Sequence, residues 1–593
     1  MRALTTEQQI IVDSVKEGKN ILVDACIGSG KTSVLEEIYK QNKTKDILYL
    51  TFNTLLKLEA KSRLPKRKGS LVTNYHGFVY PYLMRVHEKT SISESLKKFV
   101  EVYNKGKILL NHWDILLIDE YQDINEEMAN VLECVKKQNP NIQIIAVGDM
   151  AQKIYNHTRL NVLKWIMQFL DEHILLGLTK CFRISKDLAA MLGRVWNKEI
   201  HGINEDCKVL NIYFDEALEI ALQCEPSKMI CLGGNTNSNR STFQNELEGR
   251  IPEKFNKNTL YSAIRDEDKG DSKRDTSKAA VFTTFDASKG MERDFCFVFD
   301  FTYKYWKERA RLSKKYEILR NIFCVAASRG KKAIYFVRDK NIGKNDPEVI
   351  ISERILKTEF KPKGVNKEIN ISTMFEFKYK ELIDECYTCL KTEELPKVDG
   401  TTIEVINYDG YIDLNPCIGI YQEVMYFTNH NYAITWKNLR DNAIKFYLSE
   451  EMFADDITLK RRVLAATAVE TAQLRYVEQV EVDFMSAESE DRLINRISTA
   501  IPRNATIQVG CKINFEEFIA VGYCDVKHNE IIYELKFVSE LSHEHFLQCA
   551  CYMVALDMDK GILWNTRDNT MYLVHIPCVE TFKEHVKKVV IEG

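Results

Sequence analysis

The stretch ILVDACIGSGKT, residues 21–32, decides the fold, because a short apolar segment runs into a glycine-rich turn that ends in Lys31 and Thr32. With helical periodicity over residues 33–40, it has the strand, loop and helix that a phosphate-binding loop requires. In such a loop the backbone amides cradle phosphates, Lys31 reaches the β- and γ-phosphates, and Thr32 ligates Mg²⁺. We therefore predict that ATP or a related nucleotide, with Mg²⁺, binds Gly28, Ser29, Gly30, Lys31, Thr32 and Ser33.

A second apolar run, residues 115–118, leads into the acidic sequence Asp119-Glu120-Tyr121-Gln122-Asp123. A phosphate-bound Mg²⁺ needs an acidic group in its shell, and the attacking water needs a base that orients and deprotonates it. We assign the first role to Asp119 and the second to Glu120. Together with the phosphate loop, this pair predicts a motor driven by nucleotide hydrolysis.

The first 340 residues alternate short apolar runs with segments of helical periodicity. This alternation predicts an α/β fold with layers built around parallel sheets. With 593 residues, of which 45% are hydrophobic and 28% charged, the chain is long enough for about three to five compact units. The polar stretch 266–278 predicts a surface loop, and residues 341–372, rich in Lys, Pro, Gly and Asn, predict a linker.

The net charge of −3 hides an uneven distribution along the chain. Residues 1–400 carry 64 Lys and Arg against 56 Asp and Glu, whereas residues 401–593 carry 18 against 29. This split fits a basic nucleic-acid track followed by an acid-rich module, and it equally fits unevenly solvated surfaces. There is no apolar stretch of about 18 residues and no leader, so we expect no membrane contact and a cytoplasmic location, or wherever intracellular DNA lies.

Ordered motifs over residues 1–338 resemble those of superfamily 1A helicases of the UvrD/Rep/PcrA type. DEYQD is similar to the DExQD box, LTKCFRIS (178–185) to LxxNYRS, and VAASRGKK (325–332) to VAxTRAKK. The resemblance implies two RecA-like motor domains with small or absent accessory insertions. It also implies that Gln8 reads adenine, Gln152 senses the γ-phosphate, Phe182 stacks on the base, Arg183 contacts the γ-phosphate, Glu292 meets the ribose, and Arg329 is the arginine finger.

The same resemblance places residues on single-stranded DNA. Stacking aromatics and backbone electrostatics are the usual means of holding such a strand. The expected DNA contacts are Phe52, Asn53, Tyr75, His76, Tyr155, His157, Thr284 and Lys289. Core packing stays open as the alternative role of the two tyrosines, since their amphipathic rings suit either setting.

A second chemistry is predicted near the C-terminus, where two strand-like segments, 518–526 and 531–537, form a hairpin. Asp525 ends the first strand, while Glu534 and Lys536 are two apart on the second and project from one face. Two carboxylates and a lysine would thus converge. Such a trio suits metal-assisted phosphodiester hydrolysis, with Mg²⁺ held by Asp525, Glu534 and the Leu535 carbonyl.

The pattern D-x8-E-x-K, followed by Gln548-x-x-x-Tyr552, resembles the PD-(D/E)xK nucleases of the RecB/AddA type. The resemblance implies an α/β restriction-endonuclease-like domain, with Gln548 and Tyr552 contacting DNA one helical turn apart. It also adds Glu423 as a further acidic group that would ligate the metal. An E-x-K pair alone would carry no weight, and a degenerate module that only binds DNA stays open.

These observations divide the chain into four parts and predict one leading function. The parts are motor domain 1 (1–185, with a small insertion at about 62–112), motor domain 2 (186–340), a linker and helical connector (341–399) and a nuclease-like domain (400–593). We expect an ATP-dependent DNA translocase or helicase, moving 3′ to 5′ as the resemblance implies, coupled to Mg²⁺-dependent cleavage in DNA end processing, repair or recombination.

Two alternatives stay open. One is a defence or viral nuclease-helicase that degrades foreign or replicating DNA by the same chemistry. The other is an ATP-driven nucleic-acid clamp whose C-terminal module only grips the strand. The sequence also leaves open the polarity of cleavage, exonuclease versus endonuclease action, the preference between DNA and RNA, and whether a partner subunit is required.

Overall fold

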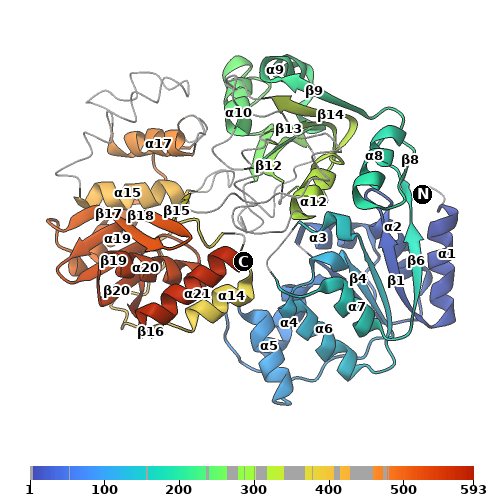
Figure 1. The fold of residues 1–593 in the computed structure, drawn as a ribbon, viewed down its shortest axis with the longest axis horizontal. Coiled ribbons are helices and arrows are strands. Elements are labelled where there is room, and N and C mark those ends of the chain that lie inside the picture. Colours follow the sequence, from blue (N-terminus) through green and yellow to red (C-terminus); the bar gives the residue numbers. More distant parts are fainter. Residues whose placement is uncertain are drawn as a thin grey trace.

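In its described residues, the computed structural model contains three large β-sheets that follow one another along the chain (Figure 1). A two-stranded sheet of β7 (Lys180–Cys181) and β8 (His201–Gly202) lies between the first and the second in the sequence. The residues that the structure describes are 4–52, 54–154, 158–234, 239–263, 278–285, 288–299, 301, 317–338, 367–376, 378–406, 414–427, 458–471, 477 and 480–593. Most of the expected surface loop, and the part of the expected linker between residues 339 and 366, lie outside these ranges. The α/β fold class is confirmed.

The first sheet has six strands in the order β3-β2-β4-β5-β1-β6, and every neighbouring pair is parallel. Its strands are β1 (Asn20–Ala25), β2 (Ile47–Thr51), β3 (Leu71–Asn74), β4 (Ile115–Asp119), β5 (Gln143–Gly148) and β6 (His173–Leu178). The phosphate loop follows β1 and the acidic pair follows β4, so both lie at the carboxyl edge of the sheet. Ligands of open α/β sheets bind at that edge.

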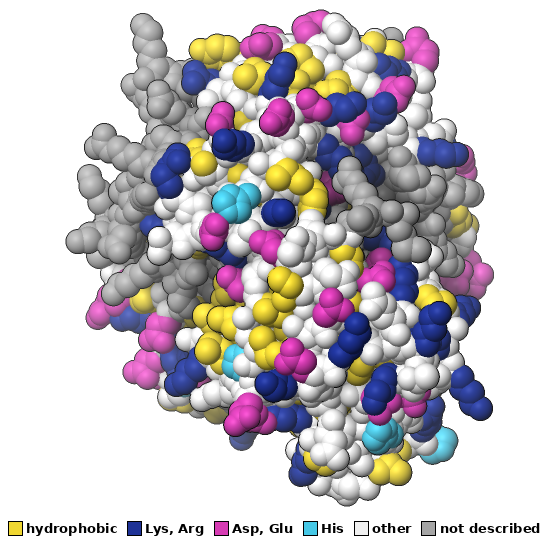
Figure 2. All heavy atoms as spheres, turned by 90° about the vertical axis from the view of Figure 1, so that its right-hand side faces the viewer, with side chains coloured by type: hydrophobic (Ala, Val, Ile, Leu, Met, Phe, Trp, Pro, Cys, Tyr) yellow, Lys and Arg dark blue, Asp and Glu magenta, His cyan; other side chains and the backbone are white. Residues whose placement is uncertain are grey.

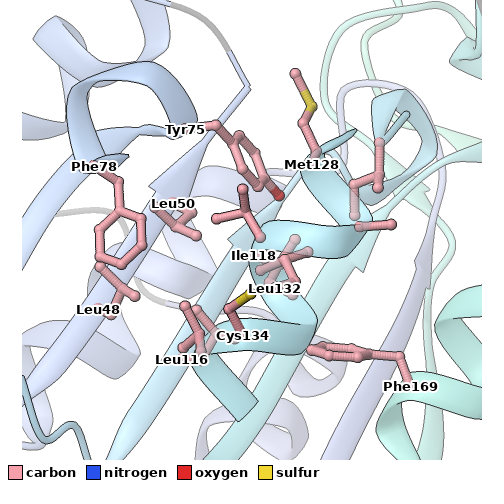
Figure 3. Packing of buried hydrophobic residues seen from close by; sticks show 14 of the residues in the cluster. Leu48, Leu50, Tyr75, Phe78, Leu116, Ile118, Met128, Leu132, Cys134 and Phe169 are labelled. Carbon is pink, nitrogen blue, oxygen red and sulfur yellow. The ribbon is translucent and has the colours of Figure 1, made fainter. Parts of the chain in front are cut away.

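The central strands of this sheet are apolar on both faces, since helices cover both. On one face Leu48, Leu50, Leu116 and Ile118 pack against α4 (Tyr75–Arg85) and α6 (Glu126–Gln138), as Figure 3 shows. On the other face the alternate residues of the same strands pack against α1 (Thr6–Ser14) and α2 (Lys31–Gln41). Parallel strands that are covered on both sides read as continuous apolar runs, which is why the sequence showed them clearly.

The small insertion expected at about 62–112 is not an appendage. Within it lie the edge strand β3 and the helices α4 and α5 (Ser95–Asn104), and their side chains belong to the main core of the first sheet. Phe78, Phe99 and Trp113 pack against one another there. The expectation was wrong because β3 is only four residues long, too short to stand out as an apolar run.

The second sheet also has six parallel strands, in the order β11-β12-β10-β13-β14-β9. They are β9 (Lys208–Tyr213), β10 (Met229–Gly233), β11 (Leu260–Ala263), β12 (Ala280–Thr284), β13 (Arg293–Val298) and β14 (Gly330–Arg338). One buried apolar cluster joins the two sheets, because Cys26 and Ala151 from the first lie with Leu188, Ile230 and Phe323. The two parallel sheets are thus packed closely on each other, and their assignment to two RecA-like domains stays a prediction.

The third sheet is mixed and runs β15-β18-β19-β20-β21-β16, with β17 paired to β18. Its strands are β15 (Lys367–Asn370), β16 (Lys391–Glu394), β17 (Thr506–Phe515), β18 (Phe518–His528), β19 (Ile531–Lys536), β20 (Lys560–Asn565) and β21 (Thr570–His575). Helices α15 (Asn415–Phe427), α17 (Leu459–Glu470) and α19 (Ala487–Ala500) pack on one face. Helices α14 (Lys380–Tyr387), α20 (His543–Ala555) and α21 (Val579–Glu592) pack on the other.

The boundary expected at residue 400 is therefore wrong. Residues 367–394, assigned to a linker and helical connector, supply both edge strands and α14 to the third sheet. The polar composition of β16, Lys391-Thr-Glu-Glu394, explains the error, because an exposed edge strand carries no apolar signature. The C-terminal domain therefore includes residues 367–394.

Helix α14 also holds the C-terminal domain against the first motor domain. Lys380 Nζ lies 2.8 Å from Glu127 Oε1 on α6, and Glu381 accepts hydrogen bonds from the Thr158 hydroxyl and the Arg159 backbone amide. On its other side, Asp384 bonds His543 Nδ1 at 2.7 Å, at the start of α20. One helix thus contacts both domains through neighbouring turns.

Two surface properties bear on the expected partners. No helix in the described part of the chain is both long and apolar enough to cross a membrane. On the face drawn in Figure 2, Lys and Arg side chains are interspersed with Asp and Glu, so the described residues form no stripe of a single sign there. A basic nucleic-acid track stays a prediction.

Candidate nucleotide-binding and acidic sites

The phosphate loop has the backbone shape that its sequence predicts. Gly28 and Gly30 adopt positive φ angles of 65° and 82°, a region that residues with a side chain rarely enter. Gly30 caps α2, which begins at Lys31, so the amides at the helix N-terminus point into the loop. A Cβ atom on Gly30 would lie 2.8 Å from Gln8 Nε2. The loop therefore requires glycine for its conformation and for the close approach of Gln8.

Gln8 lies directly against this loop. Its side-chain Nε2 donates to the Ser29 carbonyl at 3.0 Å, and its Oε1 accepts from the Thr5 amide at 3.0 Å in a capping box at the start of α1. The carboxamide is thus oriented from both ends. The structure brings Gln8 to the nucleotide site, where the reading of adenine stays a prediction.

Asp119 ends β4 and faces Thr32 across the loop. One oxygen, Oδ2, accepts hydrogen bonds from the Thr32 hydroxyl at 3.3 Å and from the Tyr49 hydroxyl at 3.0 Å. The other, Oδ1, is buried without a hydrogen-bond partner among the described residues. Burial, followed by the neighbouring Glu120 carboxylate, raises the pKa of Asp119 to about 7. A divalent cation would satisfy this oxygen and favour the ionised carboxylate, so the residues present fit Mg²⁺.

Glu120 lies next to the phosphate-loop lysine. Its backbone has a positive φ of 55°, which for a residue with a long side chain marks a strained position of the kind found at functional sites. Glu120 Oε2 is 3.6 Å from Lys31 Nζ and accepts a hydrogen bond from Gln122 Nε2 at 2.6 Å. Although burial opposes it, Lys31 and then Lys289 hold the pKa of Glu120 below its usual value. Glu120 is therefore an ionised base at neutral pH.

Glu292 and Arg329 directly precede β13 and β14 of the second sheet, and Arg183 lies against Gly28 of the phosphate loop. Arg183 Nη2 and Lys331 Nζ each lie 2.6 Å from the Glu292 carboxylate. Arg329 is buried, and its guanidinium donates to the carbonyls of Val325 at 2.8 Å and Met291 at 3.1 Å. Burial and the nearby Arg183 lower the pKa of Arg329 to about 9. Anionic phosphates would relieve this crowding of two arginines.

Lys289 and Asp123 form a buried ion pair between the two motor domains. Lys289 also donates to the Gln152 carbonyl at 3.3 Å, and its ammonium lies 5.9 Å from the centre of the Phe52 ring. The structure thus joins three predicted residues, Phe52, Gln152 and Lys289, at one point of the domain interface. Thr284 ends β12 in the second sheet and is half-buried.

The C-terminal acidic residues meet where β18 and β19 separate. These strands pair from residues 526–528 to 531–533, and beyond that point Asp525 Oδ2 accepts a hydrogen bond from the Leu535 amide at 2.8 Å. Glu534 is 1% exposed and lies 2.8 Å from Lys536 Nζ. Its second oxygen, Oε2, is buried with no hydrogen-bond partner in the described ranges. Asp525, Glu534 and Lys536 are brought together as the hairpin predicted.

Glu423 reaches the same place from α15. Burial first, and then Asp525, raise its pKa well above the usual value, although a hydrogen bond from Gln508 at 3.1 Å opposes the rise. The pKa of Glu534 is raised to about 8 by burial and Asp525. Among the described residues, no three His, Cys, Asp or Glu side chains lie close enough to hold a metal unaided. Asp525, Glu534 and the Leu535 carbonyl still fit a cation, because the unpaired Glu534 oxygen lies among mutually repelling carboxylates.

Gln548 and Tyr552 lie on α20 beneath this site. Gln548 Nε2 donates to the Tyr552 hydroxyl at 3.1 Å, and both side chains are buried. The helical spacing predicted from the sequence is therefore present. Contact of either residue with DNA stays a prediction.

Comparison with known proteins assigns the first of these regions. The family model of the AAA domain matches residues 8–158. Gabija protein GajB of Bacillus cereus (strain VD045) is 28% identical over 192 residues, which cover 24% of this chain and 39% of that protein. DNA helicase IV of Escherichia coli (strain K12) is 31% identical over 72 residues, which cover 12% of this chain and 10% of that one. The chain thus spans well under half the length of either relative.

Solved structures of helicases are also similar to part of the chain. The helicase MrfA bound to DNA aligns with a TM-score of 0.35 and 12% identity, covering 57% of this chain and 49% of that one. A Pif1 helicase structure aligns with a TM-score of 0.31 and 14% identity, covering 56% and 92%. The AAA-domain match over residues 8–158 and the partial similarity to DNA helicase IV support the resemblance of this chain to helicases.

The expected DNA contacts fare differently from one another. Tyr75 is 1% exposed and packs in the core of the first sheet, so no base can stack on its ring in this conformation (Figure 3). The core-packing alternative holds for it, because α4 begins at Tyr75 and turns the ring inward. His76, the next residue, is half-buried and bonds the Ser95 hydroxyl at 3.0 Å. Asn53, Tyr155 and His157 lie outside the described residues.

Tyr49 is a residue of the nucleotide site that was not predicted from the sequence. Its position within the apolar run 47–51 favours a core role, and its ring is indeed buried between helices. Its hydroxyl nevertheless reaches Asp119, which raises the pKa of Tyr49 further above the value that burial alone produces. A tyrosine in an otherwise aliphatic strand next to the strand of the acidic pair is the pattern that would have found it.

Proposed function

We propose that this protein is an ATP-dependent DNA translocase or helicase, moving 3′ to 5′, with a C-terminal domain that cleaves DNA in the presence of Mg²⁺. Two buried carboxylate oxygens carry the proposal. Asp119 Oδ1 in the first motor domain and Glu534 Oε2 in the C-terminal domain each lack a hydrogen-bond partner in the described part of the chain. Buried carboxylate oxygens normally have a hydrogen-bond partner, and a bound ion is one accepted reason for an exception.

In the motor, the chain's own residues would divide the work of hydrolysis. Lys31 and the amides of the phosphate loop hold the phosphates, and Thr32 and Asp119 are placed for Mg²⁺. When bound, Mg²⁺ would offset negative charge on the phosphoryl oxygens. Glu120, ionised at neutral pH, would take the proton of the attacking water, and Arg183 and Arg329 would stabilise charge on the γ-phosphate. Arg329 enters from the second sheet, whereas Arg183 lies beside the phosphate loop, so hydrolysis would alter the packing of the two domains.

In the C-terminal domain, Asp525, Glu534 and Lys536 support a phosphodiesterase. The two carboxylates and the Leu535 carbonyl would hold the cation, with Glu423 as a further acidic group. Lys536 lies 2.8 Å from Glu534 and would position a water or offset charge on the scissile phosphate. Processing of DNA ends, in repair or recombination, is the role that a nuclease tethered to a translocating motor suits.

A second candidate differs only in its biological target. A defence nuclease-helicase that degrades foreign or replicating DNA would use the same two sites. The similarity to Gabija protein GajB is the observation that favours it. A third candidate is an ATP-driven clamp whose C-terminal module binds the strand without cutting it; for this candidate, Glu534 and Lys536 would be only a structural pair.

An end-labelled duplex with a 3′ single-stranded tail tests these candidates. Purified protein is incubated with Mg²⁺ and ATP, and products are resolved on native and denaturing gels. Shortened strands that depend on ATP are expected. Displaced strands of full length would support the helicase activity and reject the nuclease activity. The absence of both strand displacement and strand-dependent ATP hydrolysis would overturn the whole proposal.

A further inference from the structure

Lys198 is a charged residue outside every motif considered above, yet it reaches the nucleotide site. It lies on the segment that connects the two motor sheets, directly after α8 (Lys186–Trp196). Asn197 ends that helix with a positive φ of 49°, and the Lys198 amide bonds the Gly193 carbonyl at 2.9 Å. The chain thus turns sharply at the helix end, and the Lys198 side chain, only 16% exposed, points back to the first sheet.

All three hydrogens of the Lys198 ammonium have an acceptor. Nζ lies 2.6 Å from Asp24 Oδ1, 2.8 Å from the Ala25 carbonyl and 3.1 Å from Asp149 Oδ1. An ammonium has three donors and no acceptor, so this environment satisfies it completely. Ala25 is the last residue of β1, directly before the phosphate loop, and Asp149 follows β5. Lys198 therefore joins the ends of two neighbouring strands.

Asp149 in turn positions two groups that the proposed hydrolysis uses. Its Oδ2 accepts from Gln152 Nε2 at 2.8 Å, and its backbone amide donates to Gln122 Oε1 at 2.9 Å. Gln122 then donates to Glu120 Oε2 at 2.6 Å. Asp149 is 1% exposed, and a buried carboxylate is stable only when it is paired and hydrogen-bonded. Removing Lys198 would leave the Asp149 carboxylate without its cation. The hydrogen bonds between Asp149 and both Gln152 and Gln122 would then be held less firmly.

We propose that Lys198 is a positioning residue for ATP hydrolysis. It pairs with Asp149 and fixes its position, so that Gln152 is held for the γ-phosphate and Gln122 is held against the base Glu120. Because Lys198 lies on the connection to the second sheet, it also ties this network to the movement between the two domains. The inference rests on the proposed ATPase function, which it deepens by naming a residue that no motif assigns.

Lys136 provides a matched control. It is a lysine on α6 of the first motor domain, also partly buried, whose Nζ bonds a carboxylate, Asp171, at 2.6 Å and a backbone carbonyl, Phe169, at 2.5 Å. It lies at the opposite end of the sheet from the phosphate loop, where β6 begins. If the ion pair of Lys198 is merely structural, Lys136→Met and Lys198→Met should change the kcat of ATP hydrolysis to a similar extent.

The test compares Lys198→Met, Lys198→Arg and Lys136→Met with the wild type. We measure the Kd of a fluorescent ATP analogue, the kcat and KM of DNA-stimulated ATP hydrolysis, and the Tm. Lys198→Met should lower kcat by about 10- to 100-fold, as loss of an outer-shell orienting group does, while Kd changes less than about threefold. Lys198→Arg keeps the charge and should recover most of the kcat, and Lys136→Met should leave kcat near the wild-type value.

Each other outcome overturns the proposal in a distinct way. If the wild-type protein does not hydrolyse ATP, both the proposed function and the positioning role of Lys198 are rejected. If the wild type and Lys198→Met hydrolyse ATP equally fast, only the positioning role of Lys198 is rejected. Parallel losses of Kd, kcat and Tm in Lys198→Met, or equal losses in Lys136→Met, assign Lys198 to folding. If Lys198→Met does not fold, Lys198→Gln decides, because it keeps a hydrogen-bond donor but removes the charge; a wild-type kcat for ATP hydrolysis in that variant overturns the positioning role.

Discussion

The nucleotide site and the C-terminal acidic site both contain buried, neighbouring carboxylates, but they differ in the positive charge that lies close to them. In the first, the carboxylates Asp119 and Glu120 lie near Lys31 and Lys289, and the pKa of Glu120 falls below its usual value. In the second, Lys536 is the cation beside Asp525 and Glu534, and burial raises the pKa values of Glu423, Asp525 and Glu534, with repulsion from Asp525 adding to the rise at Glu423 and Glu534. The motor supplies most of its own compensating charge, whereas the C-terminal site, if it acts as proposed, would need a divalent cation.

Lys31→Ala should have the largest effect. The substitution removes the cation that meets the β- and γ-phosphates and leaves Glu120 without its nearest partner, so ATP hydrolysis should fall on the order of 1,000-fold. Cleavage of a nicked or single-stranded substrate with Mg²⁺ alone should continue, because the C-terminal site is built from another sheet. Colorimetric phosphate release and a denaturing gel measure the two activities, and simultaneous loss of both would contradict their independence.

Asp525→Ala should have the converse effect. Loss of one of two metal-binding carboxylates should reduce cutting by at least about 100-fold and leave ATP hydrolysis within about twofold of wild type. Glu530→Ala, an exposed acid in the turn of the same hairpin, is the control and should cut normally. Cutting by Asp525→Ala at the wild-type rate would disprove the nuclease assignment.

The pH dependence of stability should differ with and without metal. The pKa of Glu534 is about 8 in the fold, above the ordinary value for glutamate, so the folded state binds more protons than the unfolded state between these values. Without metal, its contribution to stability should be complete below about pH 4 and should decline as the pH rises through 8. Ca²⁺ or Mg²⁺ should therefore raise the Tm more at pH 8 than at pH 6, in thermal melts of the full chain.

Glu534→Gln is the control for that experiment. A carboxamide cannot ionise, so the variant should lose most of this pH slope and most of the metal-induced rise in Tm. An unchanged slope would mean that another group titrates. A metal-induced rise that persists at full size would place the cation elsewhere.

The smallest effect is expected at Tyr49. Tyr49→Phe removes the hydrogen bond to Asp119 and leaves its ring packing intact, which should cost about 1 kcal/mol of stability. The kcat for ATP hydrolysis should fall by about three- to tenfold, since Asp119 Oδ2 keeps its bond from Thr32. Chemical denaturation and steady-state kinetics measure the two quantities. A fall in kcat as large as that of Lys31→Ala would mean that Tyr49 acts in hydrolysis directly and not through Asp119.

What could be predicted from the sequence follows the strength of local signals. The central strands β1, β4, β5 and β10 are covered on both faces, so their apolar runs and the loops after them were placed correctly. The edge strands β3 and β16 are short or polar, and the expected insertion and the domain boundary at 400 were wrong because of them. Edge strands gain stability from a single neighbour and carry no pattern that a linear reading can find.

Interactions between distant segments were the other gap. Lys198 is separated from Asp24 by 174 positions in the sequence, and Tyr49 from Asp119 by 70. Neither contact follows from spacing, because both depend on which strands become neighbours in the sheet. Tyr75 shows the reverse case, in which a motif position expected to face DNA is turned into the core by the start of a helix.

Helix α14 fixes the position of the C-terminal domain relative to the first motor domain. Lys380 and Glu381 fasten the C-terminal domain to α6 and to residues 158 and 159 of the first motor domain, and Asp384 fastens the same helix to α20, which carries Gln548 and Tyr552. Movement of the second motor domain would then leave the distance from the phosphate loop to the acidic site unchanged. A strand drawn through the protein would be cut at a set number of nucleotides from the point where it is gripped, and the fragments would share one characteristic length.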